Sequence, residues 1–329
     1  MRRLVSRRAP AFLTAVALLL TACNGDGDDG QAADDAPSPQ AAEQELAVIV
    51  ASYDVAAGED RRLLAGVLTL DAAQIAFGEV TFELGYLGDE TGGEAPLDIE
   101  ATARYLPVLG LEPEIEPTDQ PMVLVGEAGT GVYEAFVDLE EPGFYGLQVT
   151  AELADGTTRQ GRVTFEVLPE PEVPDVGDEA PRSQNLTIAD VEAGDALPVS
   201  VDSRAQGEDD EVPDAHLHDT TIADALDEGM PVVVILSTPT YCVSAFCGPL
   251  TTKLAMVATE YEDTAAFVHI EVWRDFEARE LNDAAAEWIQ TEGGGNEPWV
   301  FLVDGDGTIQ ARWDNVVDVQ DLEARLQAF

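Results

Sequence analysis

The first half of the chain alternates between apolar and polar positions with a period of two. Val80, Phe82 and Leu84 alternate with Thr81 and Glu83, and six other segments repeat this pattern. Because successive strand residues point to opposite faces of a sheet, the pattern predicts half-buried β-strands. The expected strands are 46–52, 63–70, 80–86, 99–105, 133–139, 145–149 and 163–167. Seven short strands without a convincing helix predict an antiparallel β-sandwich over residues 45–168.

The second half combines continuous apolar runs with helical spacing. The run 231–236 is typical of a central buried strand, and Leu250, Leu254 and Val257 recur at helical spacing. The other expected elements are helices at 221–227, 281–290 and 321–328 and strands at 266–272, 299–303 and 309–313. This alternation predicts an α/β domain over residues 183–329. Prolines and acids between the two domains, at 169–182, predict a semi-rigid linker.

The sandwich region contains neither cysteine nor histidine, so we expect a binding or spacer module there rather than a catalytic or transition-metal site. Pro142-Gly143-Phe144-Tyr145, which enters a strand, resembles the late-strand corner of bacterial immunoglobulin-like domains. This resemblance implies an immunoglobulin-like sandwich.

The N-terminal residues predict export. Residues 1–22 carry four arginines and then a ten-residue apolar stretch from Ala11 to Leu20. That stretch is too short to cross a membrane core of about 30 Å and is typical of a signal peptide. Leu20-Thr21-Ala22-Cys23 resembles a bacterial lipobox, which implies cleavage before Cys23 and lipidation of this residue. The alternative is an ordinary secretory signal that happens to precede a cysteine.

The mature chain is therefore expected to be extracytoplasmic and lipid-anchored to the cell membrane, with residues 23–44 as a flexible tether.

The net charge of the chain argues against nucleic acid as a partner. The chain has 65 acidic and 16 basic residues, a net charge of −49, and Lys253 is its single lysine. Nucleic-acid binding depends on clustered basic residues, so no nucleic-acid partner is expected.

Apart from Cys23, the chain has one cysteine pair, Cys242 and Cys247, located between the expected central strand and the long helix. In an oxidising compartment such a pair is expected to form a disulfide at least part of the time. Around this motif, from about 176 to 329, the chain resembles thioredoxin-like proteins of the redoxin type. The segments 176–181 and Glu297-Pro298-Trp299 resemble the family's opening segment and its cis-proline segment.

The resemblance implies thiol–disulfide exchange with extracytoplasmic thiol or disulfide proteins. Cys242 would be the attacking nucleophile and Cys247 would resolve the mixed disulfide, and the N-terminus of the following helix would stabilise a thiolate. Tyr241 stands where the family has tryptophan. Pro298 would face the disulfide and present backbone to a partner chain. Whether the chain is an enzyme is left open.

The sequence also departs from the family. Four residues separate the cysteines instead of two, and five positions along an ideal helix rise about 7.5 Å, beyond the usual disulfide limit of about 7 Å. The pair can close only if Cys242 lies in the loop ahead of the helix or if the first turn is distorted. The alternative function is a non-catalytic surface binding or assembly lipoprotein with a permanent Cys242–Cys247 disulfide.

Copper handling by the two thiolates is a third interpretation. The chain has three histidines: His216 and His218 lie in a polar stretch, and His269 lies within an expected strand. Solvated loop histidines and a satisfied core histidine explain these positions more simply. We therefore expect no metal site and no cofactor.

Overall fold

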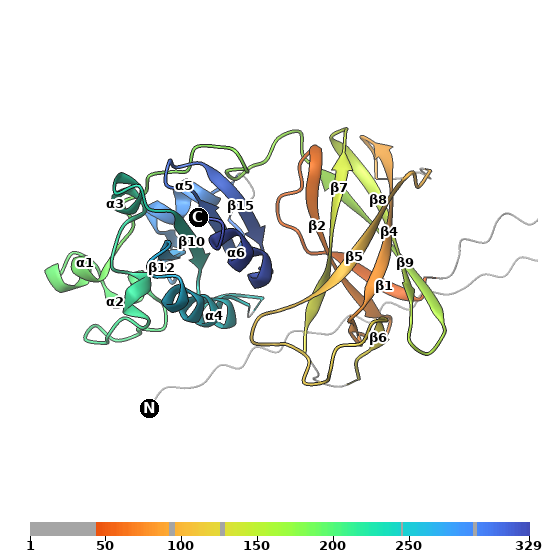
Figure 1. Cartoon of the computed structure of the whole chain (residues 1–329), viewed down its shortest axis with the longest axis horizontal. Helices are drawn as coiled ribbons and strands as arrows, with labels where there is room; N and C mark the ends of the chain where they lie inside the picture. The colour runs from red at the N-terminus through yellow and green to blue at the C-terminus, as the bar shows by residue number, and fades with distance from the viewer. Residues whose placement is uncertain (1–43, 92–95, 126–128, 245, 292–294) are drawn as a thin grey trace, which may run out of the picture. The chain divides into compact units, whose positions relative to one another are not determined.

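The computed structural model describes residues 44–91, 96–125, 129–244, 246–291 and 295–329 (Figure 1). The expected signal peptide, the lipidation site Cys23 and all but the last residue of the tether lie outside these residues. Residues 44–329 form one compact unit. Throughout the part of the chain that is described, no helix is both long and apolar enough to cross a membrane.

Seven antiparallel strands form one large sheet in the N-terminal part of this unit. They are β1 (Leu46–Val50), β2 (Gly58–Thr69), β4 (Glu79–Gly88), β5 (Ile99–Pro107), β7 (Gly131–Leu139), β8 (Gly143–Glu152) and β9 (Thr158–Val167). Their order across the sheet is β1-β2-β7-β5-β4-β8-β9, and β3 (Ile75–Ala76) pairs separately with β6 (Met122–Val123). The positions of the seven strands expected from the sequence are thus confirmed.

The two-sheet sandwich expected over 45–168 is wrong, because these strands belong to a single sheet that nearly closes on itself. Its two edge strands meet: the Glu45 backbone N–H donates to the Gln160 carbonyl at 2.8 Å, and the Gln44 side chain donates to the Arg162 carbonyl at 3.2 Å. The alternating apolar residues, such as Phe82 and Leu147, fill the core of this sheet. Alternation shows that one face is buried, but it does not show whether the strands form one sheet or two.

A mixed four-stranded sheet forms the C-terminal part. Its order is β11 (Ala266–Glu271), β10 (Val232–Ser237), β14 (Trp299–Val303) and β15 (Ile309–Asp314), with β10 and β11 parallel and the other pairs antiparallel. The helices are α1 (Ile188–Ala193), α2 (Pro198–Val201), α3 (Ile222–Asp227), α4 (Cys247–Glu260), α5 (Asp283–Ile289) and α6 (Val319–Leu326), with a 3-10 turn at Ala215–Leu217. A small hairpin joins β12 (Trp273–Asp275) to β13 (Glu280–Leu281).

Side chains of β10 alternate between two apolar cores, one on each face of this sheet. Val232 and Val234 join Trp288 of α5 in one core. Val233 joins Leu254 of α4 and Leu322 of α6 in the other. The continuous apolar run in the sequence therefore reflects a strand that is buried on both faces.

The expected fold class, a sandwich followed by an α/β thioredoxin-like domain, is wrong for the molecule. Of the described residues, 37% are in strands and 17% in helices, and the strands form one large sheet and several small ones. Apart from the 14 residues of α4, each helix has eight residues or fewer. Helical spacing over eight or ten residues specifies only about two to three turns, so the expected helices contribute little regular structure.

The acidic linker contacts the rest of the protein at several of its residues. Val173 and Ala180 are buried in the core that contains Val232. Between them, the Asp175 carboxylate forms ion pairs with Arg61 and Arg312, the second at 3.0 Å. Residues 169–182 are therefore anchored at Val173, Asp175 and Ala180, while eight of the fourteen residues are exposed.

Candidate functional site

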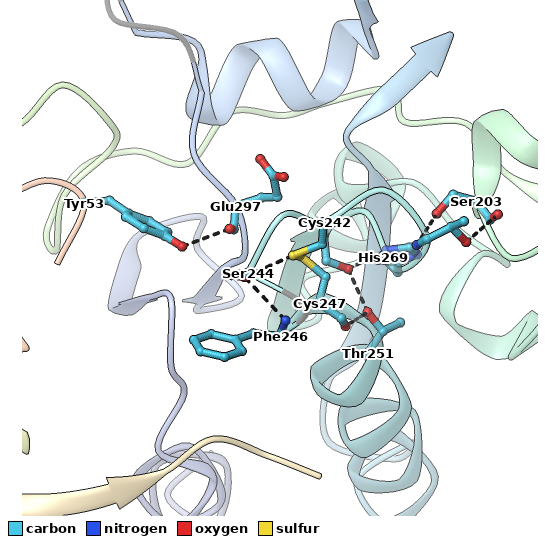
Figure 2. The surroundings of a disulfide bond; sticks show 11 residues. Tyr53, Ser203, Cys242, Ser244, Phe246, Cys247, Thr251, His269 and Glu297 are labelled. Atoms are coloured by element: carbon cyan, nitrogen blue, oxygen red, sulfur yellow. Dashed lines mark hydrogen bonds between the residues drawn. A yellow bond between two sulfur atoms is a disulfide. The ribbon is translucent and has the colours of Figure 1, made fainter. Parts of the chain in front are cut away.

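The two cysteines are joined at the start of α4 (Figure 2). Cys247 is the first residue of the helix and Cys242 lies in the turn before it, with 6.0 Å between their Cα atoms. This separation is within the range of protein disulfides. Of the two arrangements that the sequence left open, the structure shows the one in which Cys242 lies ahead of the helix.

Local sequence explains where α4 begins. Gly248 and Pro249 follow Cys247, and proline suits the first turn of a helix because its missing N–H would have no helical partner there. Before the helix, the Cys242 N–H donates to the Thr238 carbonyl at 3.1 Å. Thr240 donates from its backbone N–H and its hydroxyl to Ser203, at 3.0 and 2.8 Å. These bonds fix the turn that carries Cys242.

The two cysteines differ in exposure. Cys247 is fully buried, with 0% of its surface exposed, whereas Cys242 is half-buried and its neighbour Val243 is 99% exposed. A reactant in solution therefore reaches the disulfide from the Cys242 side. In a reduced pair, Cys242 would be the residue that meets a partner.

The start of α4 favours negative charge at this position. The helix has no acidic residue in its first turn and no side chain that caps its N-terminus. The free N–H groups and the helix dipole therefore act without a competing carboxylate, although the chain as a whole is strongly acidic. In addition, the Ser244 hydroxyl lies 3.2 Å from the Cys242 sulfur. The sequence analysis missed Ser244, because no motif assigns a role to a serine inside the cysteine loop.

The structure places Tyr241 beside Phe276. Their rings stack with centroids 4.1 Å apart, and Phe276 is 42% exposed. The Tyr241 hydroxyl accepts a hydrogen bond from the Gln206 side chain at 3.1 Å. The residue before Cys242 therefore belongs to an aromatic pair whose second ring, Phe276, is exposed.

The Glu297–Pro298 peptide bond is cis, as the resemblance of this segment led us to expect, and Pro298 is buried. The Glu297 carbonyl accepts a hydrogen bond from the Tyr53 hydroxyl at 2.9 Å, so this backbone group is already occupied (Figure 2). Burial raises the pKa of the Glu297 carboxyl to about 7.

A chain of hydrogen bonds runs from the first turn of α4 into the sheet. The Thr251 hydroxyl donates to the Cys247 carbonyl at 2.8 Å and lies 2.7 Å from the Ser237 hydroxyl. The Ser237 hydroxyl is in turn 2.9 Å from His269 Nε2 (Figure 2). Burial lowers the pKa of His269 to about 3, so its ring is neutral at pH 7.

The three histidines lie in different surroundings. His216 is exposed, and its Nε2 is 3.0 Å from the Ala255 carbonyl. The interpretation of His218 as a solvated loop residue is wrong, because it is fully buried. His269 is a core residue as expected, but its Nδ1 has no hydrogen-bond partner. Polar residues within apolar strands, such as Ser237 and His269, were the available sequence signal for this buried network.

The chain has little detectable similarity to characterised proteins. No protein-family model and no curated protein sequence matches it. Among solved structures, it is similar to the crystal structure of MtrC from Shewanella baltica OS185, with 11% sequence identity and a TM-score of 0.20. The match covers 42% of this chain and 24% of that one. A likeness at this level supports no conclusion about fold or function, so the functional argument depends on the site itself.

Proposed function

We propose that the protein exchanges thiols and disulfides with protein partners outside the cytoplasmic membrane, to which lipidated Cys23 anchors it. The observation that carries this proposal is the asymmetry of the disulfide. A half-buried Cys242 is joined to a fully buried Cys247 at the N-terminus of a 14-residue helix. One cysteine is placed to meet a partner and the other to complete the reaction.

Reduction of a partner disulfide would proceed in two balanced steps. The Cys242 thiolate attacks one sulfur of the partner disulfide, which forms a mixed disulfide and releases the other partner sulfur as a thiolate. The Cys247 thiolate then attacks the Cys242 sulfur, which closes the Cys242–Cys247 disulfide and releases the second partner thiolate. The reverse sequence oxidises a partner dithiol and leaves Cys242 and Cys247 reduced.

Two features favour a polypeptide as the partner. The stacked rings of Tyr241 and Phe276 offer apolar surface next to the reactive turn. The Ser244 hydroxyl can donate a hydrogen bond to a thiolate at Cys242, because the two atoms are 3.2 Å apart. A site with these features binds side chains around a cysteine and stabilises the attacking sulfur.

Trapping of mixed disulfides tests the proposal. The Cys247→Ser variant lacks the resolving thiol, so Cys242 should accumulate adducts with partner proteins that are visible on non-reducing gels and are released by dithiothreitol. The Cys242→Ser variant is the matched control, with both variants made in a Cys23→Ser background, and it should accumulate none, because its remaining cysteine, Cys247, is buried. Absence of adducts in Cys247→Ser, or equal adducts in both variants, would overturn the exchange mechanism.

A second candidate is a non-catalytic binding or assembly protein with a structural disulfide. The packing of the cysteine loop favours it: Phe246 contacts the apolar cluster that contains Leu106 and Val316. A loop held in this way gains rigidity from a permanent crosslink. A glutathione titration separates the two functions, because a reduction potential below about −300 mV is typical of structural disulfides.

A further inference from the structure

Three side chains from separate parts of the C-terminal region meet in a buried cluster. They are Asp202, just after α2, His218, just after the 3-10 turn, and His269 in β11. Asp202 Oδ2 is 3.6 Å from His218 Nε2 and 3.7 Å from His269 Nδ1, and one potential ligand atom from each residue lies within 4.8 Å of the others. All three side chains are 0% exposed.

The two imidazoles lack the hydrogen bonds that buried rings normally make. Both ring nitrogens of His218 and the Nδ1 of His269 have no partner. A buried polar atom without a partner destabilises a protein, and such atoms are rare in folded proteins. Nitrogen atoms of both rings nevertheless lie within 4 Å of the same carboxylate oxygen. A ligand between these atoms would satisfy them.

We propose that Asp202, His218 and His269 bind one divalent transition-metal ion of the zinc class. Two imidazole nitrogens and one carboxylate oxygen are a ligand set that zinc uses in proteins, with bond lengths of about 2.0–2.2 Å. Tetrahedral ligands at those lengths are separated by about 3.3 Å. The separations of 3.6 and 3.7 Å from Asp202 Oδ2 to the two rings need to shorten by a few tenths of an ångström, and the ligand nitrogens of the two rings, which lie within 4.8 Å of each other, also have to approach.

The residues around the cluster hold the ligands in suitable orientations. With the proton on Nε2, His269 donates a hydrogen bond to the Ser237 hydroxyl 2.9 Å away, which leaves the lone pair of Nδ1 free to bind an ion next to Asp202. Asp202 Oδ1 accepts hydrogen bonds from the Arg204 backbone N–H at 2.9 Å and from Arg204 Nε at 3.0 Å. Metal ligands in proteins are commonly oriented by hydrogen bonds of this type.

Arg204 also restricts where the ion can lie. Its Nη2 is 2.6 Å from Asp202 Oδ2, and its Nη1 pairs with Asp214 at 2.8 Å. A carboxylate oxygen has a second lone pair, so Oδ2 can accept from the guanidinium and still bind an ion on the histidine side. A metal there would connect the 202–218 segment to β11.

Metal content and a cobalt spectrum test this inference. We would use the full chain with Cys23→Ser and with the Cys242–Cys247 disulfide intact, so that no free thiol competes for metal. Because the ligands are buried, the protein is refolded with Zn²⁺ or with Co²⁺, and weakly bound ions are then removed by dialysis. We expect about one zinc ion per chain and the visible absorption of Co²⁺ bound to nitrogen and oxygen ligands.

Variants at two neighbouring histidines make the test specific. His218→Ala should retain less than about a tenth of the zinc, whereas His216→Ala, at an exposed position, should retain all of it. Asp202→Asn should weaken binding, and its circular dichroism spectrum would show whether the fold is kept. Equal zinc retention by His218→Ala and wild type, or no retention by wild type, would overturn the proposal and leave a cluster without metal.

Discussion

The Glu297→Gln substitution is expected to stabilise the folded protein by about 1 to 2 kcal/mol at pH 8. In the folded state, burial raises the pKa of Glu297 from 4.5 to about 7. Each pKa unit corresponds to about 1.4 kcal/mol, so this rise corresponds to about 3.4 kcal/mol at most. Because the side chain is only partly buried, solvent screening reduces the effect to the smaller value.

The direction of the pH dependence follows from the same values. Below pH 4.5 the carboxyl is protonated in both the folded and the unfolded chain, so the substitution should have little effect on stability. Between pH 4.5 and about 7 the unfolded chain ionises while the folded chain keeps the proton, so the wild-type protein loses stability as the pH rises. Above pH 7 this loss is complete, and the glutamine variant avoids it.

Urea denaturation of both proteins between pH 4 and pH 8 measures the difference directly. Subtracting one stability curve from the other cancels the contributions of the many other acidic residues. Glu262→Gln is the matched control, because Glu262 is exposed. A wild-type-minus-variant difference that does not change with pH, or a glutamine variant that is less stable at pH 8, would refute the reasoning.

Two further substitutions test the packing and the reactive turn. Glu134→Ala should destabilise the protein by about 3 kcal/mol in urea denaturation, because it removes a buried carboxylate 2.6 Å from Arg62. Asp314 still pairs with that arginine in the variant. A loss of stability below about 1 kcal/mol would contradict this prediction. In the reduced protein, Ser244→Ala should slow alkylation of Cys242 roughly fivefold at pH 7, because about 1 kcal/mol of hydrogen bonding to the thiolate is lost. An unchanged alkylation rate would show that the hydroxyl does not stabilise the thiolate.

Part of the geometry of the cysteine site could be predicted from the sequence. The spacing of Cys242 and Cys247 predicted that the pair closes only if the first cysteine precedes the helix or the first turn is distorted, because five helical positions separate Cα atoms too widely. Gly248-Pro249 was compatible with both arrangements, because proline suits the first helical turn. Both inferences are local: they depend on residues adjacent in the chain and on fixed backbone geometry. The difference in exposure between the two cysteines was not predictable, because it depends on what packs around each one.

The buried cluster of Asp202, His218 and His269 illustrates what local patterns miss. His218 lies in a polar stretch that reads as a solvated loop, yet it is fully buried. Its burial arises because the 3-10 turn before it packs against β11 and α4. Contacts between residues that are remote in the sequence, such as His218 and His269, leave no periodic signal, so only the folded chain shows that these three residues meet.

The sequence by itself determined where the strands run and which of their faces are buried, since alternation of apolar residues follows directly from the geometry of an extended backbone. Only the tertiary structure decided that seven strands form one nearly closed sheet, that Val173 and Ala180 anchor the acidic linker in a core, and that distant polar residues share a buried cluster. These features arise from pairing and packing between remote segments, where many arrangements bury the same residues equally well.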